Sequence, residues 1–289
     1  MSVSVIIPFY NAQKYIHKAI DSCLKQNEVS QLILVDDGST DKSVDIIESF
    51  GDERILLLSH NQNKGRSTAR NTGMSAVTKS YLSFLDADDF FLENRFSSAL
   101  MFLDADPLID GVYEQVKTKF ESGIDLEHYP LITAIMEEVE PCNLFEYLVL
   151  RKEHFSIIGC TFRSTSVLHN FSFDENLVIG EDTDFIWNLA FHKKLIGTPG
   201  PPKIVRRVHN KNTVFSKNKY FWKYIFYKKW NSNLGQYKMK AEMKAKIISS
   251  YAYYKSKNKS VSVIIQKIYQ WKTQGVEIIN NPDAILGFF

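Results

Sequence analysis

The chain has few cysteines and no long apolar run. Its 289 residues include only Cys23, Cys142 and Cys160, which cannot all pair and have no spacing typical of a metal site. No apolar run approaches the roughly 20 residues that a membrane-spanning helix needs. The N-terminus has no basic segment ahead of a hydrophobic stretch, so it does not look like a signal peptide. We therefore expect free thiols in a reducing compartment and a cytoplasmic protein.

The sequence also lacks the glycine signatures of three common enzyme classes. No two glycines are spaced as in GxG, which excludes the dinucleotide-binding fingerprint. The phosphate loop GxxxxGK followed by Ser or Thr is absent, and so is the nucleophile motif GxSxG of α/β hydrolases. What remains for chemistry is an unusual set of acidic residues at the ends of predicted strands.

Strands and helices alternate along the first part of the chain. Short apolar runs predict strands, and apolar residues at helical spacing predict helices between them, in the order 3–9, 12–26, 31–35, 41–50, 54–58, 67–78 and 81–85. This alternation predicts a parallel sheet with helices on both faces. Further along, we expect a strand, three helices and another strand over 111–119, 143–151, 164–169, 182–194 and 203–209, with a loop at 137–141.

Two of the predicted strands end in clustered aspartates. Asp36-Asp37 follows the second strand, and Asp86-Ala87-Asp88-Asp89 follows the fourth. The carboxyl ends of strands in an open parallel sheet are where ligands bind. Three carboxylates at this edge would repel one another unless a cation shared them, and hard oxygen ligands suit Mg²⁺ or Mn²⁺ with substrate phosphates. The alternative is that Asp86 and Asp88 only cap a following helix.

Ordered motifs along the chain carry a family resemblance. They are Pro8-Phe9-Tyr10-Asn11, VDDGSTD at 35–41, NKG at 63–65 with ARNTG at 69–73, and FLDADD at 84–89. This set resembles the bacterial family 2 glycosyltransferases, which have the GT-A fold of nucleotide-diphospho-sugar transferases. FDE at 173–175, GED at 180–182 and His209 resemble that family's acceptor-side motifs. The resemblance covers about residues 3–212 and leaves 213–289 outside it.

The resemblance implies a fold class and a domain organisation. We expect an α/β protein of the GT-A fold, with a mostly parallel central sheet flanked by helices and a helical C-terminal extension. Residues 1–212 would form the catalytic domain, with 1–110 binding the nucleotide sugar and 111–212 binding the acceptor. Residues 213–289 would form a basic, aromatic extension.

The resemblance also implies roles at the donor site, which would hold Pro8, Tyr10, Asn11, Asp37, Arg70 and Asp86. Tyr10 would stack on the base, as aromatic rings do. Asp37 would accept from the uracil imide N–H, although it could instead cap a helix. Arg70 would reach the nucleotide or its phosphates, with a solvated helix arginine as the alternative. Asp86 would contact the ribose or the metal.

The metal and catalytic roles follow from the same resemblance. Asp88, with Asp86 and His209, would bind Mn²⁺ or Mg²⁺, and this ion would neutralise the departing diphosphate. A lone histidine is a weak metal candidate, so His209 is an open assignment. Asp182 would be the general base that deprotonates the acceptor hydroxyl. Alternatively, Glu181 and Asp182 would only stabilise the start of a helix, and both interpretations can hold together.

These roles predict a metal-dependent, inverting glycosyltransferase of surface polysaccharide synthesis. It would move a hexose or hexosamine from a UDP-sugar to a saccharide or lipid-linked saccharide. The alternatives are a nucleotidyltransferase that makes sugar nucleotides, although Phe9-Tyr10-Asn11-Ala12 stands where its glycine-rich loop would be, and a non-catalytic sugar-nucleotide binder. A glycoside hydrolase could also use two carboxylates, but it would not need Asp37 or the metal site.

Charge is distributed unevenly along the chain. Residues 1–184 hold 15 Lys and Arg against 30 Asp and Glu, whereas residues 185–289 hold 20 against 3. The segment 217–230, KNKYFWKYIFYKKW, interleaves lysines with aromatics, which is typical of a helix lying in a membrane interface. We therefore expect peripheral contact with the inner face of a membrane, or else a helix whose aromatics pack on the catalytic domain. Nucleic acid is a poorer partner, because no nucleic-acid-binding motif accompanies the charge.

Overall fold

The computed structural model describes residues 2–121, 144–150, 155–210, 212 and 219–233. The chain divides into two compact units, residues 1–212 and 213–289. The division into a catalytic domain and an extension, with the roles assigned to each, stays a prediction. The predicted loop at 137–141 and the extension outside 219–233 lie outside the described residues.

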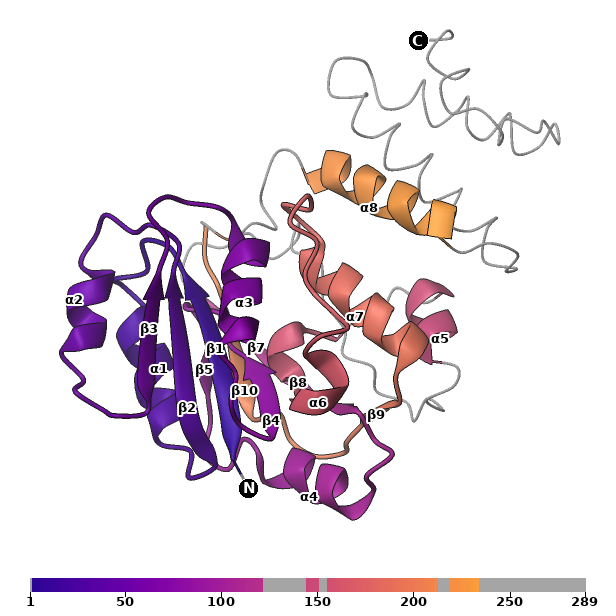
Figure 1. Ribbon diagram of the computed structural model, residues 1–289, viewed down its shortest axis with the longest axis horizontal. Helices are drawn as coiled ribbons and strands as arrows, with labels where there is room; N and C mark the ends of the chain where they lie inside the picture. The colour runs from indigo at the N-terminus through magenta and orange to yellow at the C-terminus, as the bar shows by residue number, and fades with distance from the viewer. Residues whose placement is uncertain (1, 122–143, 151–154, 211, 213–218, 234–289) are drawn as a thin grey trace, which may run out of the picture. The chain divides into compact units, whose positions relative to one another are not determined.

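A seven-stranded sheet forms the centre of the first unit (Figure 1). Its strands stand in the order β3 (Ile55–Ser59), β2 (Val29–Asp36), β1 (Val3–Phe9), β4 (Tyr81–Phe84), β8 (Cys160–Arg163), β6 (Gly111–Tyr113) and β9 (Leu195–Gly197). β1 to β4 are mutually parallel, and β8 runs antiparallel to both its neighbours, β4 and β6. The prediction of a mostly parallel central sheet is therefore confirmed.

β1 lies in the middle of this sheet, and every one of its residues is buried. Its sequence VSVIIPF is apolar on both faces, as expected for a strand covered by helices on each side. Pro8 lacks an N–H and would normally be excluded from a central strand. Here the pairing of β1 with β4 ends at Ile6 and Phe84, so Pro8 lies beyond the part of β1 that pairs with β4. On the β2 side, Pro8 still pairs in register with Val35.

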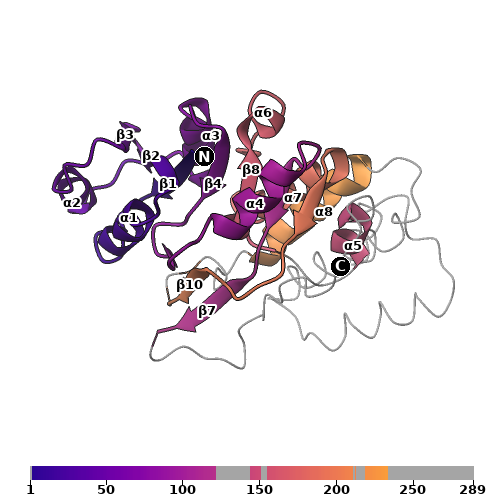
Figure 2. The same ribbon diagram turned by 90° about the horizontal axis from the view of Figure 1, so that it is seen from below.

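The helices α1 (Ile16–Leu24) and α3 (Arg66–Ser75) cover opposite faces of β1 and β2 (Figures 1 and 2). α2 (Ser43–Glu48) packs beside α1. This follows from strand order, because the chain moves outward from β1 to β3 and then returns to place β4 on the other side of β1. Gly73 lets α3 approach the sheet closely, since a Cβ there would lie 2.5 Å from Ile6 Cγ2.

A small second sheet has the order β5 (Phe90–Phe91), β10 (Ile204–Val208) and β7 (Val116–Phe120). The single strand predicted over 111–119 is wrong, because these residues form β6 in one sheet and β7 in the other. The break lies at Glu114, whose backbone N–H donates to the Gly159 carbonyl and whose side chain pairs with the buried Arg95. These are long-range contacts, which the local apolar pattern does not show.

The remaining described helices are α4 (Ser97–Ala105), α5 (Leu144–Leu150), a 3-10 turn at Ile157–Gly159, α6 (Ser164–Val167), α7 (Glu181–His192) and α8 (Lys219–Asn233). The helices expected at 143–151, 164–169 and 182–194 are therefore present, with α6 shorter than predicted. α7 begins after Gly180, which has a left-handed φ of 91°. Inside the first unit, Phe173 stacks on Phe185 with ring centroids 4.1 Å apart, so α7 is anchored to the segment before it.

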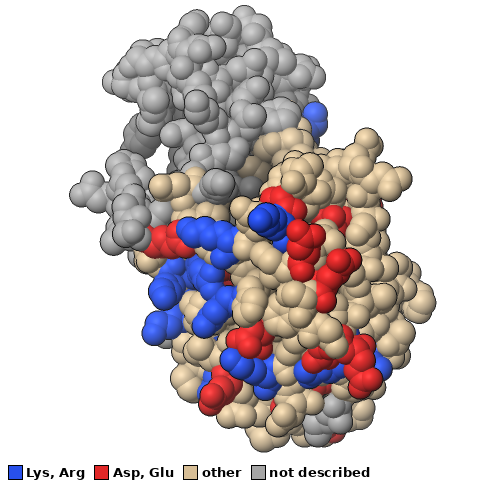
Figure 3. Space-filling view, turned by 90° about the vertical axis from the view of Figure 1, so that its left-hand side faces the viewer, with Lys and Arg blue, Asp and Glu red and all other residues tan. Residues whose placement is uncertain are grey.

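No helix among the described residues is both long enough and apolar enough to span a membrane. Basic side chains group at the left of the face drawn in Figure 3. In the first unit, Lys117 and Lys119 are exposed on β7, and Lys119 pairs in register with Arg207. In α8, Phe226 and Trp230 are buried one helical turn apart, while Lys228 is exposed.

Candidate active site

The topology puts a switch point between the ends of β1 and β4, and this is where we expect a ligand. The strand order reverses at these two neighbours, and open α/β sheets bind ligands in the crevice at such a switch point. Tyr10 and Asn11 follow the end of β1, Asp36 and Asp37 lie at the end of β2, and residues 86–89 follow β4. The sheet thus brings the two aspartate motifs to one edge, as the sequence predicts.

Asp86, Asp88 and Asp89 form a carboxylate cluster. Each offers an oxygen, and these three atoms lie within 4.8 Å of one another. Asp89 is buried and its Oδ1 accepts from the Arg207 N–H at 2.7 Å, which fixes β10 beside the cluster. Burial and the nearby Asp88 and Asp86 raise the pKa of Asp89 well above its ordinary value. A cation would relieve this repulsion, and an all-oxygen donor set fits Mg²⁺ or Mn²⁺.

His209 joins this cluster from the end of β10. Its Nε2 lies 2.8 Å from Asp88 Oδ2, and Asn212 Nδ2 donates to the same oxygen at 3.2 Å. The ring stacks on Tyr15, with centroids 4.9 Å apart and an interplanar angle of 10°. The structure therefore places His209 beside Asp88, 121 positions away in the chain, and its role as a metal ligand stays a prediction.

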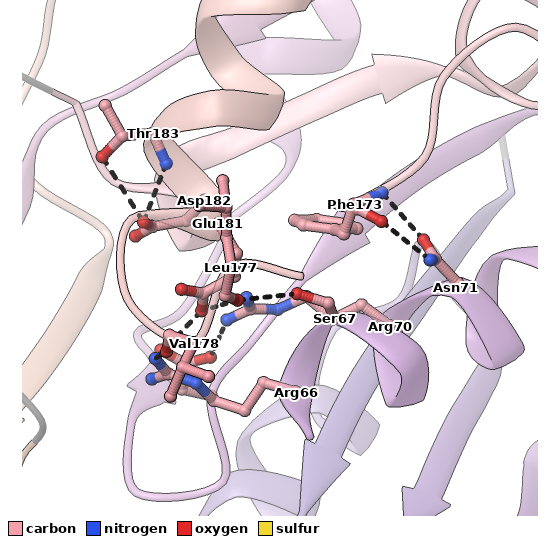
Figure 4. Close-up of polar contacts among 11 residues, drawn as sticks. Arg66, Ser67, Arg70, Asn71, Phe173, Leu177, Val178, Glu181, Asp182 and Thr183 are labelled. Carbon is pink, nitrogen blue, oxygen red and sulfur yellow. Dashed lines mark hydrogen bonds and ion pairs between the residues drawn. The ribbon is translucent and has the colours of Figure 1, made fainter. Parts of the chain in front are cut away.

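Asp86 and Glu181 are bridged by Arg70 of α3 (Figure 4 shows the contacts around Arg70 and Glu181). Arg70 Nη2 donates to Asp86 Oδ1 at 2.8 Å, and Nη1 donates to Glu181 Oε1 at 3.0 Å. The Arg70 and Glu181 side chains are only 1% and 3% exposed. Sequence reasoning assigned Arg70 to the nucleotide or its phosphates, whereas here its guanidinium binds two carboxylates.

Charges in this network set the pKa values of its members. Burial disfavours ionisation of Asp86, but Arg70 and Arg66 outweigh it, so the pKa of Asp86 lies below its ordinary value. Glu181 shows the opposite result, because burial and the neighbouring Asp182 raise its pKa against the effect of Arg66 and Arg70. Burial also opposes the charge of Arg70, yet Asp86, Glu181 and Asp182 raise the pKa of its guanidinium above the ordinary value.

Asp182 stands in the first turn of α7, where its carboxylate is half-buried. Its Oδ1 accepts from the backbone N–H of Thr183 at 2.8 Å, as drawn in Figure 4. Its charge helps to raise the pKa of the Arg70 guanidinium, so it lies near the Arg70 bridge. The structure thus puts the predicted base next to Glu181 at the start of α7, and its catalytic role stays a prediction.

Asp37 is held at the end of β2 by a set of hydrogen-bond donors. Oδ1 accepts from His60 Nδ1 and from the Lys64 N–H, both at 2.8 Å, and Oδ2 accepts from the Gly65 N–H at 2.8 Å. Gly65 has φ of +95°, a left-handed conformation that favours glycine. These donors occupy Asp37 away from α2, whose first residue, Ser43, donates its N–H to Asp41 Oδ1 at 3.0 Å instead.

The residues after β1 differ in what they offer to a ligand. Tyr10 is 50% exposed, so its ring is available for stacking. Asn11 has a left-handed φ of 51° and ties two loops together, because its Oδ1 accepts from the Thr40 N–H and its own N–H donates to Ser39 Oγ. Pro8 is buried in the strand. Tyr10 is therefore suited to direct contact, whereas Asn11 shapes the loop.

Sequence reasoning missed several residues that the structure places in the site. His60, Tyr15 and Asn212 have no motif of their own, and only their neighbours across the fold show their positions. Glu181 was considered as a helix-start residue, and its pairing with Arg70 is a contact 111 positions apart in sequence. The sequence around Glu181 does not show that its partner is Arg70.

Comparison with known proteins agrees with this geometry. Residues 4–169, more than half of the chain, match the model of glycosyl transferase family 2. The chain is 33% identical over 220 residues to the minor teichoic acid biosynthesis protein GgaB of Bacillus subtilis, covering 71% of this chain and 23% of GgaB. It is 34% identical over 105 residues to the Escherichia coli UDP-Glc:alpha-D-GlcNAc-diphosphoundecaprenol beta-1,3-glucosyltransferase WfaP, covering 36% and 42%.

Among solved structures, S. aureus TarS 1-349 in complex with UDP-GlcNAc superposes with a TM-score of 0.63 at 20% identity, covering 87% of this chain and 72% of that one. This likeness shows the GT-A fold. The chain belongs to glycosyl transferase family 2. It spans less than half the length of the two curated relatives described above.

Proposed function

We propose that this protein is an inverting, metal-dependent glycosyltransferase that uses a UDP-sugar. The observation that carries the proposal is the Asp86, Asp88 and Asp89 cluster at the switch point, joined by His209 and linked through Arg70 to the start of α7. Family membership and relatives named for teichoic acid and lipid-linked saccharide synthesis support it. The sugar would be a hexose or hexosamine, and the product a surface polysaccharide.

The donor nucleotide would lie across the ends of β1, β2 and β4. Tyr10 would stack on the base, and Asp37 Oδ2 would accept from the imide N–H of uracil. Asp86 is 34% exposed and would contact the ribose or a metal. TarS 1-349, which has the same fold, was solved with UDP-GlcNAc, and this supports a uridine donor.

Asp88, Asp86 and His209 would hold Mn²⁺ or Mg²⁺. The bound ion would supply charge neutralisation for the departing diphosphate. Arg206 of β10 lies near enough to Asp86 and Asp89 to favour the charged form of each, although the pKa of Asp89 stays raised, so it adds positive charge on this side. His209 and Asn212, which both contact Asp88 Oδ2, would orient that carboxylate.

Asp182 would take the proton from the acceptor hydroxyl. Its position in the first turn of α7 leaves the carboxylate half-buried and close to Arg70, which in turn binds Asp86. Deprotonated by this base, the acceptor oxygen would attack the anomeric carbon from the face opposite the diphosphate and invert the configuration. A saccharide or lipid-linked saccharide is the acceptor that we propose, with residues 1–212 as the catalytic domain.

The experiment that tests this function combines donor screening with one variant. UDP-sugars should raise the melting temperature in the presence of Mn²⁺, because a ligand that binds only the folded state stabilises it. Asp88→Ala should remove the Mn²⁺ dependence of UDP binding, whereas Glu48→Ala, an exposed change on α2, should leave it intact. An Asp88→Ala protein that binds UDP with the parent's Mn²⁺ dependence would show that the metal site lies elsewhere.

A further inference from the structure

His60 makes a buried connection between α3 and Asp37. It follows β3, and its backbone N–H donates to the Asp36 carbonyl at 2.8 Å. Nδ1 of the ring lies 2.8 Å from Asp37 Oδ1, and Nε2 lies 3.0 Å from the hydroxyl of Thr72 on α3. The side chains of His60 and Asp37 are 8% and 5% exposed. Both ring nitrogens therefore make their hydrogen bonds to protein groups inside the fold.

The chemistry of the groups decides which atom donates in each of the two hydrogen bonds of the His60 ring. An ionised carboxylate only accepts, so Nδ1 of His60 carries the proton and donates to Asp37. In the neutral ring, Nε2 then accepts from the Thr72 hydroxyl. A neutral ring in this tautomer satisfies both contacts.

Counting acceptor positions shows what the contact does to Asp37. Each carboxylate oxygen offers about two acceptor positions. Oδ1 uses both, for His60 Nδ1 and the Lys64 N–H, while Oδ2 accepts from the Gly65 N–H among the described residues. The carboxylate is therefore fixed in one orientation, with one acceptor position of Oδ2 left for a ligand.

We propose that His60 is the positioning residue that orients Asp37 and thereby sets the choice of nucleobase. This inference rests on the proposed use of a UDP-sugar. Uracil presents an N–H at N3, which a fixed carboxylate oxygen can accept. Cytosine presents an unprotonated N3 at the same place, and two acceptors facing each other leave a buried group unpaired. His60 does not touch the base and acts through Asp37.

Three substitutions separate orientation from simple space filling. His60→Leu keeps an apolar body of similar size and removes the donor to Asp37. His60→Asn keeps a donor, because its Nδ2 can occupy the place of the ring Nδ1. Thr72→Val removes the outer hydroxyl with little change in shape. Thr68→Val, one turn earlier on the same helix and half-buried like Thr72, is its matched control, because the Thr68 hydroxyl donates to the Lys64 carbonyl.

The test is calorimetric titration of the whole chain with UDP and with CDP at a fixed Mn²⁺ concentration. We expect the parent to prefer UDP, and His60→Leu to bind UDP about tenfold more weakly or worse with CDP little changed, the usual worth of a hydrogen bond to a charged group. His60→Asn should keep most of the preference. Thr72→Val should lose part of it, and Thr68→Val none.

The possible outcomes each decide a point. An unchanged UDP to CDP ratio in a folded His60→Leu protein overturns the inference, and so does a His60→Asn protein as unselective as His60→Leu. If His60→Leu does not fold, the ratios for His60→Asn and Thr72→Val still decide, because a role in packing alone predicts no change of preference in Thr72→Val. A parent protein that binds neither nucleotide refutes the proposed function itself, which is a different result from loss of selectivity.

Discussion

Arg70→Met is expected to destabilise the first unit far more than the equivalent change at Arg66. Both guanidinium groups contact Glu181 Oε1 at 3.0 Å, but Arg70 is 1% exposed and Arg66 is 40% exposed. Removing one partner of a buried ion pair costs about 3–5 kcal/mol, because the other charge stays buried. Glu181 keeps Arg66 and Asp86 is partly hydrated, so we expect a loss of about 3 kcal/mol for Arg70→Met. Arg66→Met should lose about 0–1 kcal/mol.

Urea unfolding followed by fluorescence measures both losses. At a slope of about 3 kcal/mol/M, the Arg70→Met midpoint should fall by about 1 M. The double variant Arg70→Met with Glu181→Gln should lose less than the sum of the single changes, since the orphaned charge is gone. Equal midpoints for Arg70→Met and Arg66→Met would refute the argument that burial makes this bridge strong.

The same variant has a predictable pH dependence. The raised pKa of Glu181 means that the folded state holds its proton to higher pH than the unfolded chain does, so stability falls as pH rises through that range. Without Arg70 the pKa of Glu181 should rise further. The stability deficit of Arg70→Met should therefore shrink as pH is lowered from about 7 to about 5, still above the ordinary pKa of Asp86.

Three further predictions concern other parts of the chain. Asp182→Asn should lower turnover by about 10²-fold or more with donor binding nearly unchanged, the usual worth of a positioned general base; normal turnover would direct attention to Glu181. Burial raises the pKa of the Cys23 and Cys160 thiols, so alkylation at pH 8 should spare them until urea unfolds the chain, as peptide mass spectrometry can check. If residues 217–230 contact a membrane, the protein should sediment with anionic but not neutral liposomes and be released by salt; recovery in the supernatant throughout would discard that proposal.

The strands and helices of the first half were predictable because their signals are local. β1 was predicted with the bounds that the structure has, and its apolar run needs no partner to be recognised. β5, β8 and β9 were missed, since each has two to four residues and exists through pairing with distant segments. The fold class followed from the alternating elements and the ordered motifs, while the second sheet and the split at Glu114 depended on contacts that no local pattern contains.

The candidate site shows the same division. The aspartates at 86–89 stood out because acidic residues directly after a buried strand are unusual, and the structure gathers them within 4.8 Å. Arg70 also stood out, but its partner could not be read from its neighbours along the chain. An arginine on a helix can point to solvent, to a phosphate or to a buried carboxylate, and only the fold decides among these.

α3 explains why one short helix determines so much of this site. Three consecutive residues leave it in different directions, because successive side chains on a helix are about 100° apart. Arg70 binds Asp86 and Glu181, Asn71 Nδ2 donates to the Phe173 carbonyl at 3.0 Å, and Thr72 contacts His60. These contacts bring segments from three parts of the chain to one helix.

Close packing of the helix on the sheet makes these contacts possible. Gly73 brings α3 onto β1 at a distance that a side chain would prevent. A displacement of the helix would therefore move Asp37 through His60 and the start of α7 through Glu181 at the same time. If Asp37 recognises the nucleobase and Asp182 is the base, as proposed, substitutions at Arg70 and Gly73 should alter donor binding and turnover together, whereas changes at Tyr10 should alter donor binding alone.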